Sequence, residues 1–100
     1  MKIKRIVKLT FAPELVQQFL SEVFDTSKEK IRAFPGCEHM ELLQDASRPN
    51  VLFTLSVWEN EAALEAYRQS ELFQSTWANT KILFADRPEA WSVYVNDAPI

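Results

Sequence analysis

The order of two hydrophobic periodicities along the chain constrains its fold more than any other feature of the sequence. In a β-strand every second side chain points to the same face, whereas in an α-helix every third or fourth does. In chain order, the patterns indicate a strand over 2–11, a helix over 12–34, strands over 37–44 and 51–58, a helical region over 61–77 and a strand over 90–95. This β-α-β-β-α-β order predicts an α+β fold of the ferredoxin-like class, in which two helices cover one face of a four-stranded antiparallel sheet. We expect residues 1–100 to form one such domain.

Local signals mark where the predicted helices begin and end. Pro13 suits the first position of a helix, and Glu14 suits the positive end of the helix dipole. The first helix should end before Pro35, because the residue that precedes a proline avoids helical angles. Asn60 and Ser70 can each cap a helix, so we expect the second helical region to break at Ser70.

One face of the predicted sheet has no helix to cover it. Apolar residues lie on both sides of the strands over 51–58 and 90–95, so this face would expose apolar side chains. An exposed apolar face of that size is typical of an association surface. We therefore expect a symmetric homodimer in which the two sheets face each other and form a dimeric α/β barrel.

Charge and cysteine content exclude several classes of protein. The net charge is −3 and no block of basic residues occurs, which argues against a nucleic-acid partner. The single cysteine, Cys37, excludes an internal disulfide and fits a reducing compartment. No apolar run approaches the ~20 residues that a membrane helix needs, and the N-terminus lacks the pattern of a secretory signal. We expect a cytoplasmic protein with no membrane partner.

Five aromatic residues are candidates for a site that binds a small hydrophobic or aromatic molecule. Tyr67 and Trp77 combine an apolar ring with a polar tip, which suits a flat phenolic molecule. Phe73 and Phe24 would be apolar walls of the same pocket, and Trp58 would face either this pocket or the dimer interface. The alternative is that these rings fill the core, which is the usual meaning of aromatics at helical spacing.

Three other side chains have titratable or charged groups. His39, the only histidine, is a candidate for proton transfer, and the alternative is a surface histidine on a strand. Cys37 would share a strand face with His39 about 7 Å away, which does not indicate a catalytic pair. Arg5 would balance an anionic intermediate or form a salt bridge across the dimer, and the salt bridge is the favoured role. A single histidine cannot build a metal site, so we expect no metal.

A set of short motifs runs in order through nearly the whole chain. The motifs are FPGC at 34–37, Asp45 and Pro49 in the turn, VWEN at 57–60, Ala63, Leu64, Tyr67, Ser70 and Phe73, and WSVY at 91–94. No single motif is highly specific. The ordered set resembles the antibiotic biosynthesis monooxygenase family of dimeric α/β-barrel proteins.

The resemblance implies a chemistry as well as a fold. Founding members of this family oxidise polycyclic aromatic phenols with molecular oxygen and use no metal, flavin or haem. The carbanion or phenolate of the substrate itself reduces the oxygen, while the protein supplies a dry aromatic pocket and handles protons. Other relatives degrade haem, isomerise a signalling sugar derivative or have no known activity.

Three positions distinguish this chain from relatives in the family. Haem-degrading members have an asparagine where Val7 lies, and they bind iron through a histidine where Trp77 lies. Tryptophan cannot ligate iron, so the resemblance disfavours haem degradation here. Many members have a histidine where Tyr67 lies, and a tyrosine with its ordinary pKa near 10 is a poor base at neutral pH. Tyr67 would instead donate a hydrogen bond or a proton.

The resemblance, together with the candidate residues, implies a cofactor-independent monooxygenase that acts on a small aromatic, phenolic or quinol substrate. Tyr67 would orient the substrate, Trp77 would stack on it, and His39 would move protons. Two alternatives stay open. One is a non-catalytic domain with a ligand-binding or stress-related role, and the other is an isomerase of a small carbonyl compound, in which Tyr67 or His39 would act on an enolisable proton.

Overall fold

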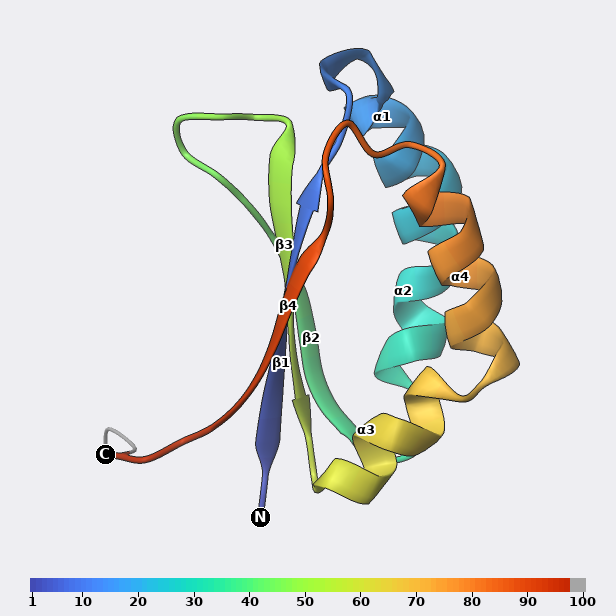
Figure 1. Ribbon diagram of the computed structural model, residues 1–100. Helices are drawn as coiled ribbons and strands as arrows, with labels where there is room; N and C mark the ends of the chain where they lie inside the picture. The colour runs from blue at the N-terminus through green and yellow to red at the C-terminus, as the bar shows by residue number, and fades with distance from the viewer. Residues whose placement is uncertain (98–100) are drawn as a thin grey trace.

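Helices cover one face of a four-stranded antiparallel sheet in the computed structural model, which describes residues 1–97 (Figure 1). The strands are β1 (Ile3–Thr10), β2 (Cys37–Gln44), β3 (Val51–Trp58) and β4 (Glu89–Tyr94), in the spatial order β2-β3-β1-β4. The helical segments are η1 (Pro13–Leu15), α1 (Val16–Gln18), η2 (Phe19–Phe24), α2 (Asp25–Arg32), α3 (Glu61–Arg68) and α4 (Glu71–Lys81). The predicted α+β fold of the ferredoxin-like class is confirmed.

Side-chain alternation gives the two faces of the sheet different environments. Leu9 of β1 pairs with Leu52 of β3, and both are buried beneath the helices. The neighbouring pair, Lys8 and Phe53, is less buried and lies on the face away from the helices. The pattern of the sequence thus assigns one face of each strand to the covered side and the other to the uncovered side.

A β-bulge at the start of β2 changes which of its residues share a face. Cys37 pairs with Trp58, whereas His39 pairs with Val57. Neighbouring residues of β3 point to opposite faces, so Cys37 lies on the helix-covered face and His39 on the uncovered face. The expectation that both share a face is wrong because it assumed an unbroken strand, and a bulge inserts one extra residue.

The first helical region is divided into four short pieces and is not the single helix expected over 12–34. Its segment η2 is a π-helix, in which hydrogen bonds join residues five apart, and the N–H of Asp25 donates to the carbonyl of Leu20 in this way. Because this wider turn brings residues five apart to the same face, Phe19 and Phe24 lie together, with ring centroids 6.3 Å apart.

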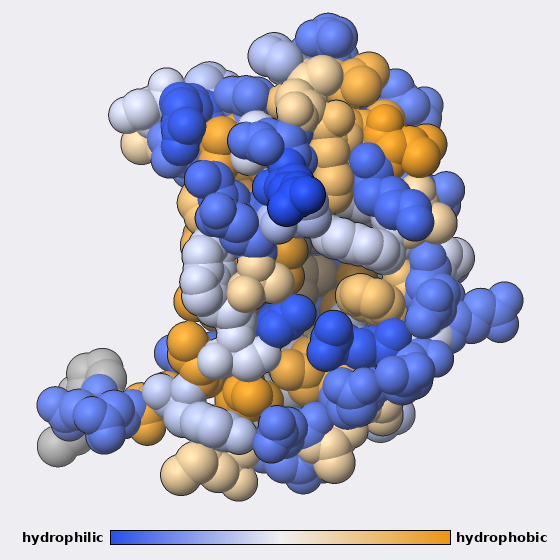
Figure 2. All heavy atoms as spheres, in the orientation of Figure 1, coloured by the Kyte–Doolittle hydropathy of each residue, from blue (hydrophilic) through white to orange (hydrophobic). Residues whose placement is uncertain are grey.

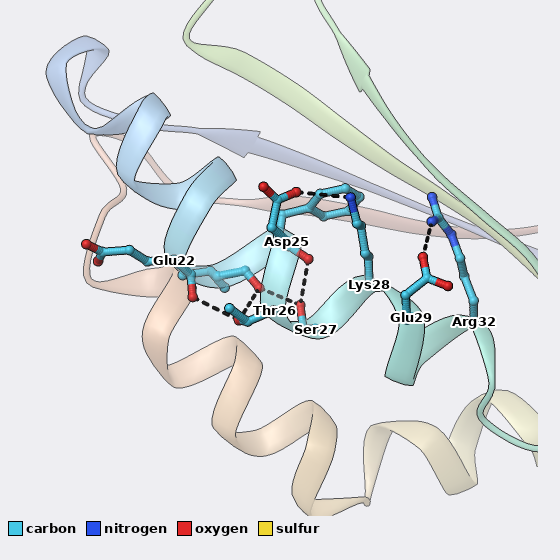
Figure 3. Close-up of polar contacts among 9 residues, drawn as sticks. Glu22, Asp25, Thr26, Ser27, Lys28, Glu29 and Arg32 are labelled. Carbon is cyan, nitrogen blue, oxygen red and sulfur yellow. Dashed lines mark hydrogen bonds and ion pairs between the residues drawn. The ribbon is translucent and has the colours of Figure 1, made fainter.

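Two hydroxyl groups offer a physical reason for this irregularity. Thr26 and Ser27, at the start of α2, point back along the helix in Figure 3. Both donate to the carbonyl of Val23, at 3.0 and 2.7 Å. Hydroxyl bonds of this kind compete with the backbone ladder and disturb helix geometry.

Side-chain caps begin the two later helices, as predicted. The side chain of Asn60 accepts a hydrogen bond from the N–H of Ala63 at 2.8 Å and begins α3. Ser70 accepts a hydrogen bond from the N–H of Phe73 at 3.1 Å and begins α4. The predicted break at Ser70 is therefore confirmed, and it sets the direction of α4 over the sheet.

The sheet face opposite the helices is uncovered (Figure 1). Large apolar side chains on this side are between 38 % and 45 % exposed, namely Leu43, Trp91, Val93 and Val95. A group of exposed apolar residues on one face is unusual for an isolated soluble chain.

Two hydrophobic clusters fill the space between the sheet and the helices. The larger cluster contains Leu9, Phe11, Phe19, Val23, Leu52 and Leu83. The smaller cluster contains Ile3, Trp58 and Leu64. Since Ile3 and Leu9 lie near opposite ends of β1, the clusters are separated along the strand, and Arg5 and Val7 lie between them.

Candidate functional site

A cavity of about 330 Å³ lies between the two clusters, over the middle of the sheet. Figure 2 shows a hollow between the sheet and the helices, with hydrophobic residues inside it and hydrophilic residues around it. The sheet lines the cavity with Arg5, Val7, Leu9, Met40, Thr54, Ser56, Trp58 and Ala90. The helical segments line it with Phe19, Val23, Phe24, Ser27, Ile31, Leu64, Tyr67, Arg68, Phe73, Thr76, Trp77 and Thr80. A mostly apolar cavity of this size, with a few polar groups, is typical of a small-molecule site.

Aromatic contacts hold Tyr67 in place on the helix side of this cavity. Its ring stacks on Trp58, with centroids 4.9 Å apart, and meets Phe34 and Phe73 edge-on at 5.4 and 5.3 Å. Burial raises the pKa of Tyr67 to about 12, and the charge of the Cys37 thiolate would raise it in the same direction. The hydroxyl therefore stays protonated at neutral pH, where it can donate a hydrogen bond but cannot act as a base.

Trp77 and Phe73 form a flat aromatic wall on α4. They lie one helical turn apart, and their rings are nearly parallel, at 8°, with centroids 6.1 Å apart. Phe24 contributes to the wall from η2. The structure thus brings Tyr67, Trp77, Phe73 and Phe24 to one cavity, and each is half-buried.

An unbroken chain of nine aromatic rings joins the two clusters, and six of these rings line the cavity. Successive ring centroids lie between 4.4 and 6.3 Å apart, which is the spacing of stacked and edge-to-face pairs. In order of contact the rings are those of Phe34, Trp58, Tyr67, Phe73, Trp77, Phe84, Phe11, Phe19 and Phe24. A flat apolar ligand would therefore meet aromatic rings on several sides.

Trp58 lies on the cavity side of the sheet and not on the uncovered side. Its side chain is fully buried, and its indole N–H donates to the hydroxyl of Ser56 at 2.9 Å. This hydrogen bond satisfies the only polar atom of the ring. Trp58 thus forms a wall of the cavity beneath Tyr67, with no free polar tip to offer a ligand.

The structure does not bring His39 to the cavity. It lies on the uncovered face of β2, and its Nε2 is 3.5 Å from a carboxylate oxygen of Glu41. Its side chain is 52 % exposed. His39 and Tyr67, the two residues predicted to act on protons, therefore lie on opposite faces of the sheet.

Cys37 packs against the smaller cluster on the covered face. Burial raises the pKa of its thiol, and this outweighs the backbone hydrogen bond of His39 and the charge of Arg32, which both lower it. A thiol of raised pKa is a weak nucleophile at neutral pH. Within residues 1–97, no group of three or more His, Cys, Asp or Glu side chains is placed to hold a metal ion.

Arg5 points to the helix-covered side of β1, and its salt bridge across the dimer stays a prediction. Its guanidinium lines the cavity and donates to the hydroxyl of Ser92 at 2.8 Å. The strand alternation predicted which side chains share its face, but not that this face would enclose a cavity.

Arg68 and Thr76 line the cavity without having been predicted as site residues. Arg68 lies in the last turn of α3, where the helix dipole favours a basic residue, so its type alone indicates only a surface charge. Their spacing from apolar residues on the same helix is the signal that could have identified them. Arg68 follows the buried Leu64 by four residues and Thr76 follows Phe73 by three, which places each pair on one helix face.

The described part of the chain, residues 1–97, contains no helix that is long and apolar enough to cross a membrane.

Comparison with known proteins gives one family and a set of related structures. The family model described as antibiotic biosynthesis monooxygenase matches residues 3–79. No curated protein matches the chain.

Several solved structures share the fold at low sequence identity. A conserved protein from Methanosarcina mazei Go1 is 22 % identical, with a TM-score of 0.88 over 93 % of this chain and 91 % of that one. Rv0793 from Mycobacterium tuberculosis is 18 % identical, with a TM-score of 0.88 over 98 % of both chains. A variant of SnoaB from Streptomyces nogalater, described as a cofactor-independent oxygenase, is 14 % identical, with a TM-score of 0.83 over 97 % of this chain and 95 % of that one.

Proposed function

Because the chain belongs to the antibiotic biosynthesis monooxygenase family, we propose that it is a cofactor-independent monooxygenase of a small aromatic, phenolic or quinol substrate. The observation that supports this most directly is the aromatic cavity, in which Tyr67, Phe73 and Trp77 lie side by side. SnoaB, which has the same fold, is described as a cofactor-independent oxygenase.

The lining of the cavity suits the reaction that this proposal assigns to the protein. A substrate such as an anthrone loses a proton, and the resulting carbanion gives electrons to molecular oxygen. One oxygen atom replaces the two hydrogens of the reacting carbon as a carbonyl, and the other leaves as water, so atoms and electrons balance without a further reductant. The protein binds the rings, limits access of water and donates hydrogen bonds to the developing oxyanion.

Tyr67 and Trp77 have separate roles in this proposal. Trp77 and Phe73 stack on the substrate rings, and the neutral hydroxyl of Tyr67 donates a hydrogen bond to the substrate oxygen. His39 lies on the other face of the sheet, so in this chain the substrate proton must leave by another route, such as water at the open side of the cavity.

Oxygen uptake tests the proposal. Purified protein should consume oxygen above autoxidation with at least one member of a panel of anthrones and dihydroxyphenols. Tyr67→Phe removes one hydrogen bond to the substrate and should slow uptake about tenfold. Trp77→Ala removes the stacking wall and should raise the substrate concentration needed for half-maximal uptake.

The matched control is Tyr94→Phe, which removes the same hydroxyl from an exposed tyrosine bonded to Glu61. This variant should keep the wild-type rate. If uptake is absent, or equal in all variants and in heated protein, the monooxygenase proposal fails. Binding of the same compounds without uptake would support a ligand-binding domain.

The proposal includes a homodimer in which the uncovered sheet faces of two chains meet. The exposed side chains of Leu43, Trp91, Val93 and Val95 support it, because association would remove them from water. The wild-type mass in light scattering should be twice that of one chain, and Trp91→Glu should bring it down to that of one chain.

The control for this dimer test is Ile82→Glu. Ile82 is 72 % exposed but lies at the end of α4, on the helix side of the molecule. This variant should keep the wild-type mass. A monomeric wild type, or a Trp91→Glu variant that keeps the mass of two chains, would contradict the proposed interface.

A further inference from the structure

Two arginines lie at the same cavity, although most of its wall is apolar. Arg5 comes from the middle of β1 and Arg68 from the last turn of α3. Hydrophilic residues are visible beside the hollow in Figure 2. A cavity that only held a neutral aromatic ring would have no need for two guanidinium groups.

A hydrogen bond holds the Arg5 side chain in place, but no acidic side chain among residues 1–97 forms an ion pair with it. Its Nη1 donates to the hydroxyl of Ser92 at 2.8 Å, which leaves most of its five N–H donors for other partners. None of the ion pairs within residues 1–97 includes Arg5. Burial lowers the pKa of Arg5, and the nearby charge of Arg68 lowers it further, while Glu65 opposes both effects.

Arg68 has only a weak acidic partner. Its Nη1 lies 3.4 Å from Glu65, and the other oxygen of the same carboxylate accepts a hydrogen bond from Gln69 at 2.8 Å. The Glu65 carboxylate is thus shared between Arg68 and Gln69. The charge at this side of the cavity is positive, since Arg5 and Arg68 outnumber Glu65.

Cations elsewhere on the helices have the same kind of acidic partner as Arg68, at shorter distances. In Figure 3, Lys28 and Arg32 each meet an acidic side chain one turn earlier, Asp25 at 3.1 Å and Glu29 at 2.9 Å. These are ordinary surface pairs that point along the helix. Arg5 has no such partner among residues 1–97, and this leaves a position that an anion would fill.

We propose that the substrate carries a carboxylate, which binds between Arg5 and Arg68 while its aromatic ring lies against Trp77 and Phe73. The inference rests on the proposed function, because it assigns the same cavity to the substrate. Guanidinium and carboxylate groups match in shape and form charge-assisted hydrogen bonds, which are stronger than neutral ones. The two arginines and the aromatic wall would then together fix the orientation of the substrate.

Two probe molecules of nearly equal size test whether the cavity prefers a ligand that carries a carboxylate. They are 2-naphthoate and 2-naphthylmethanol, which share the ring and differ in the charged group. Titration calorimetry at low salt should show 2-naphthoate binding at least about tenfold more tightly to the wild-type protein. Added salt should reduce this preference, because ions screen the attraction at an open cavity.

Three variants test which arginines cause the preference for 2-naphthoate over 2-naphthylmethanol. Arg5→Gln and Arg68→Gln should each reduce it, while affinity for 2-naphthylmethanol stays within about twofold of wild type. Arg48→Gln is the matched control, since Arg48 lies in the turn between β2 and β3, away from the cavity. It should keep the full preference. Far-UV circular dichroism identifies any variant that fails to fold. Arg68 is an exposed residue in the last turn of α3, so Arg68→Gln provides an independent test if Arg5→Gln does not fold.

The outcomes separate this inference from the proposed activity. Equal binding of the two probes, or an unchanged preference in both arginine variants, would overturn the carboxylate site and leave the monooxygenase proposal intact. If neither probe binds the wild-type protein, the carboxylate site is also overturned. A carboxylate preference without oxygen uptake would keep the site and remove the oxygenase chemistry.

Discussion

Replacing Trp58 with alanine is expected to lower the free energy of unfolding by about 3–5 kcal/mol. The Trp58 side chain is fully buried, and it contacts Phe34 and Tyr67 through its ring. Truncation would leave a void beneath Tyr67 and remove the hydrogen bond from the indole to Ser56. Urea unfolding followed by far-UV circular dichroism measures the change, at one fixed protein concentration in case the chains associate.

Trp77→Ala is the matched control for this prediction. The substitution is the same, but Trp77 is half-buried and already faces a cavity on one side. Fewer contacts are lost, so its free energy of unfolding should fall by less than that of Trp58→Ala. Equal losses in the two variants would contradict the expectation that the fully buried Trp58 contributes more to stability than the half-buried Trp77.

Gly36→Ala is expected to lower the free energy of unfolding by about 2–4 kcal/mol. Gly36, the only glycine, has a φ of +88°, which residues with a side chain rarely adopt. An added Cβ would also overlap the Cβ of Ala63 on α3. The backbone cannot easily move away, because the Gly36 carbonyl accepts a hydrogen bond from the N–H of Glu59 at 2.9 Å.

A second substitution separates the two causes. In an Ala63→Gly background the overlap disappears and only the backbone strain remains, so Gly36→Ala should then cost about 1–2 kcal/mol. Ala63→Gly alone lowers helix stability by about 1 kcal/mol, and this is subtracted as in any double-mutant cycle. An equal cost of Gly36→Ala in both backgrounds would show that contact with Ala63 plays no part.

The features that the sequence predicted correctly are those that depend on neighbouring residues. Asn60 and Ser70 begin helices because each side chain reaches an N–H three residues later. Alternation along β1 placed Arg5 on the same face as its apolar neighbours. Helical spacing likewise brought Tyr67 and Trp77 to the inner side.

The features that could not be predicted depend on contacts between distant segments. The face on which His39 lies follows from its pairing with Val57 after a bulge, and no local pattern marks that bulge. Hydrogen bonds in the π-helical turn at η2 join residues five apart, whereas those of an α-helix join residues four apart. This difference is too small for the periodicity of the sequence to reveal. The role of Arg68 depends on α3 and β1 contributing to the same cavity, which a residue type in isolation cannot indicate.

The separation of the hydrophobic interior into two clusters has a thermodynamic consequence. A ligand bound in the cavity between the two clusters would stabilise the folded chain and raise its melting temperature. At equal concentration, a ligand that binds more tightly would raise it more. Melting temperature can therefore rank compounds before any reaction is known. A substrate bound in this cavity would be packed between the two hydrophobic clusters as core side chains are.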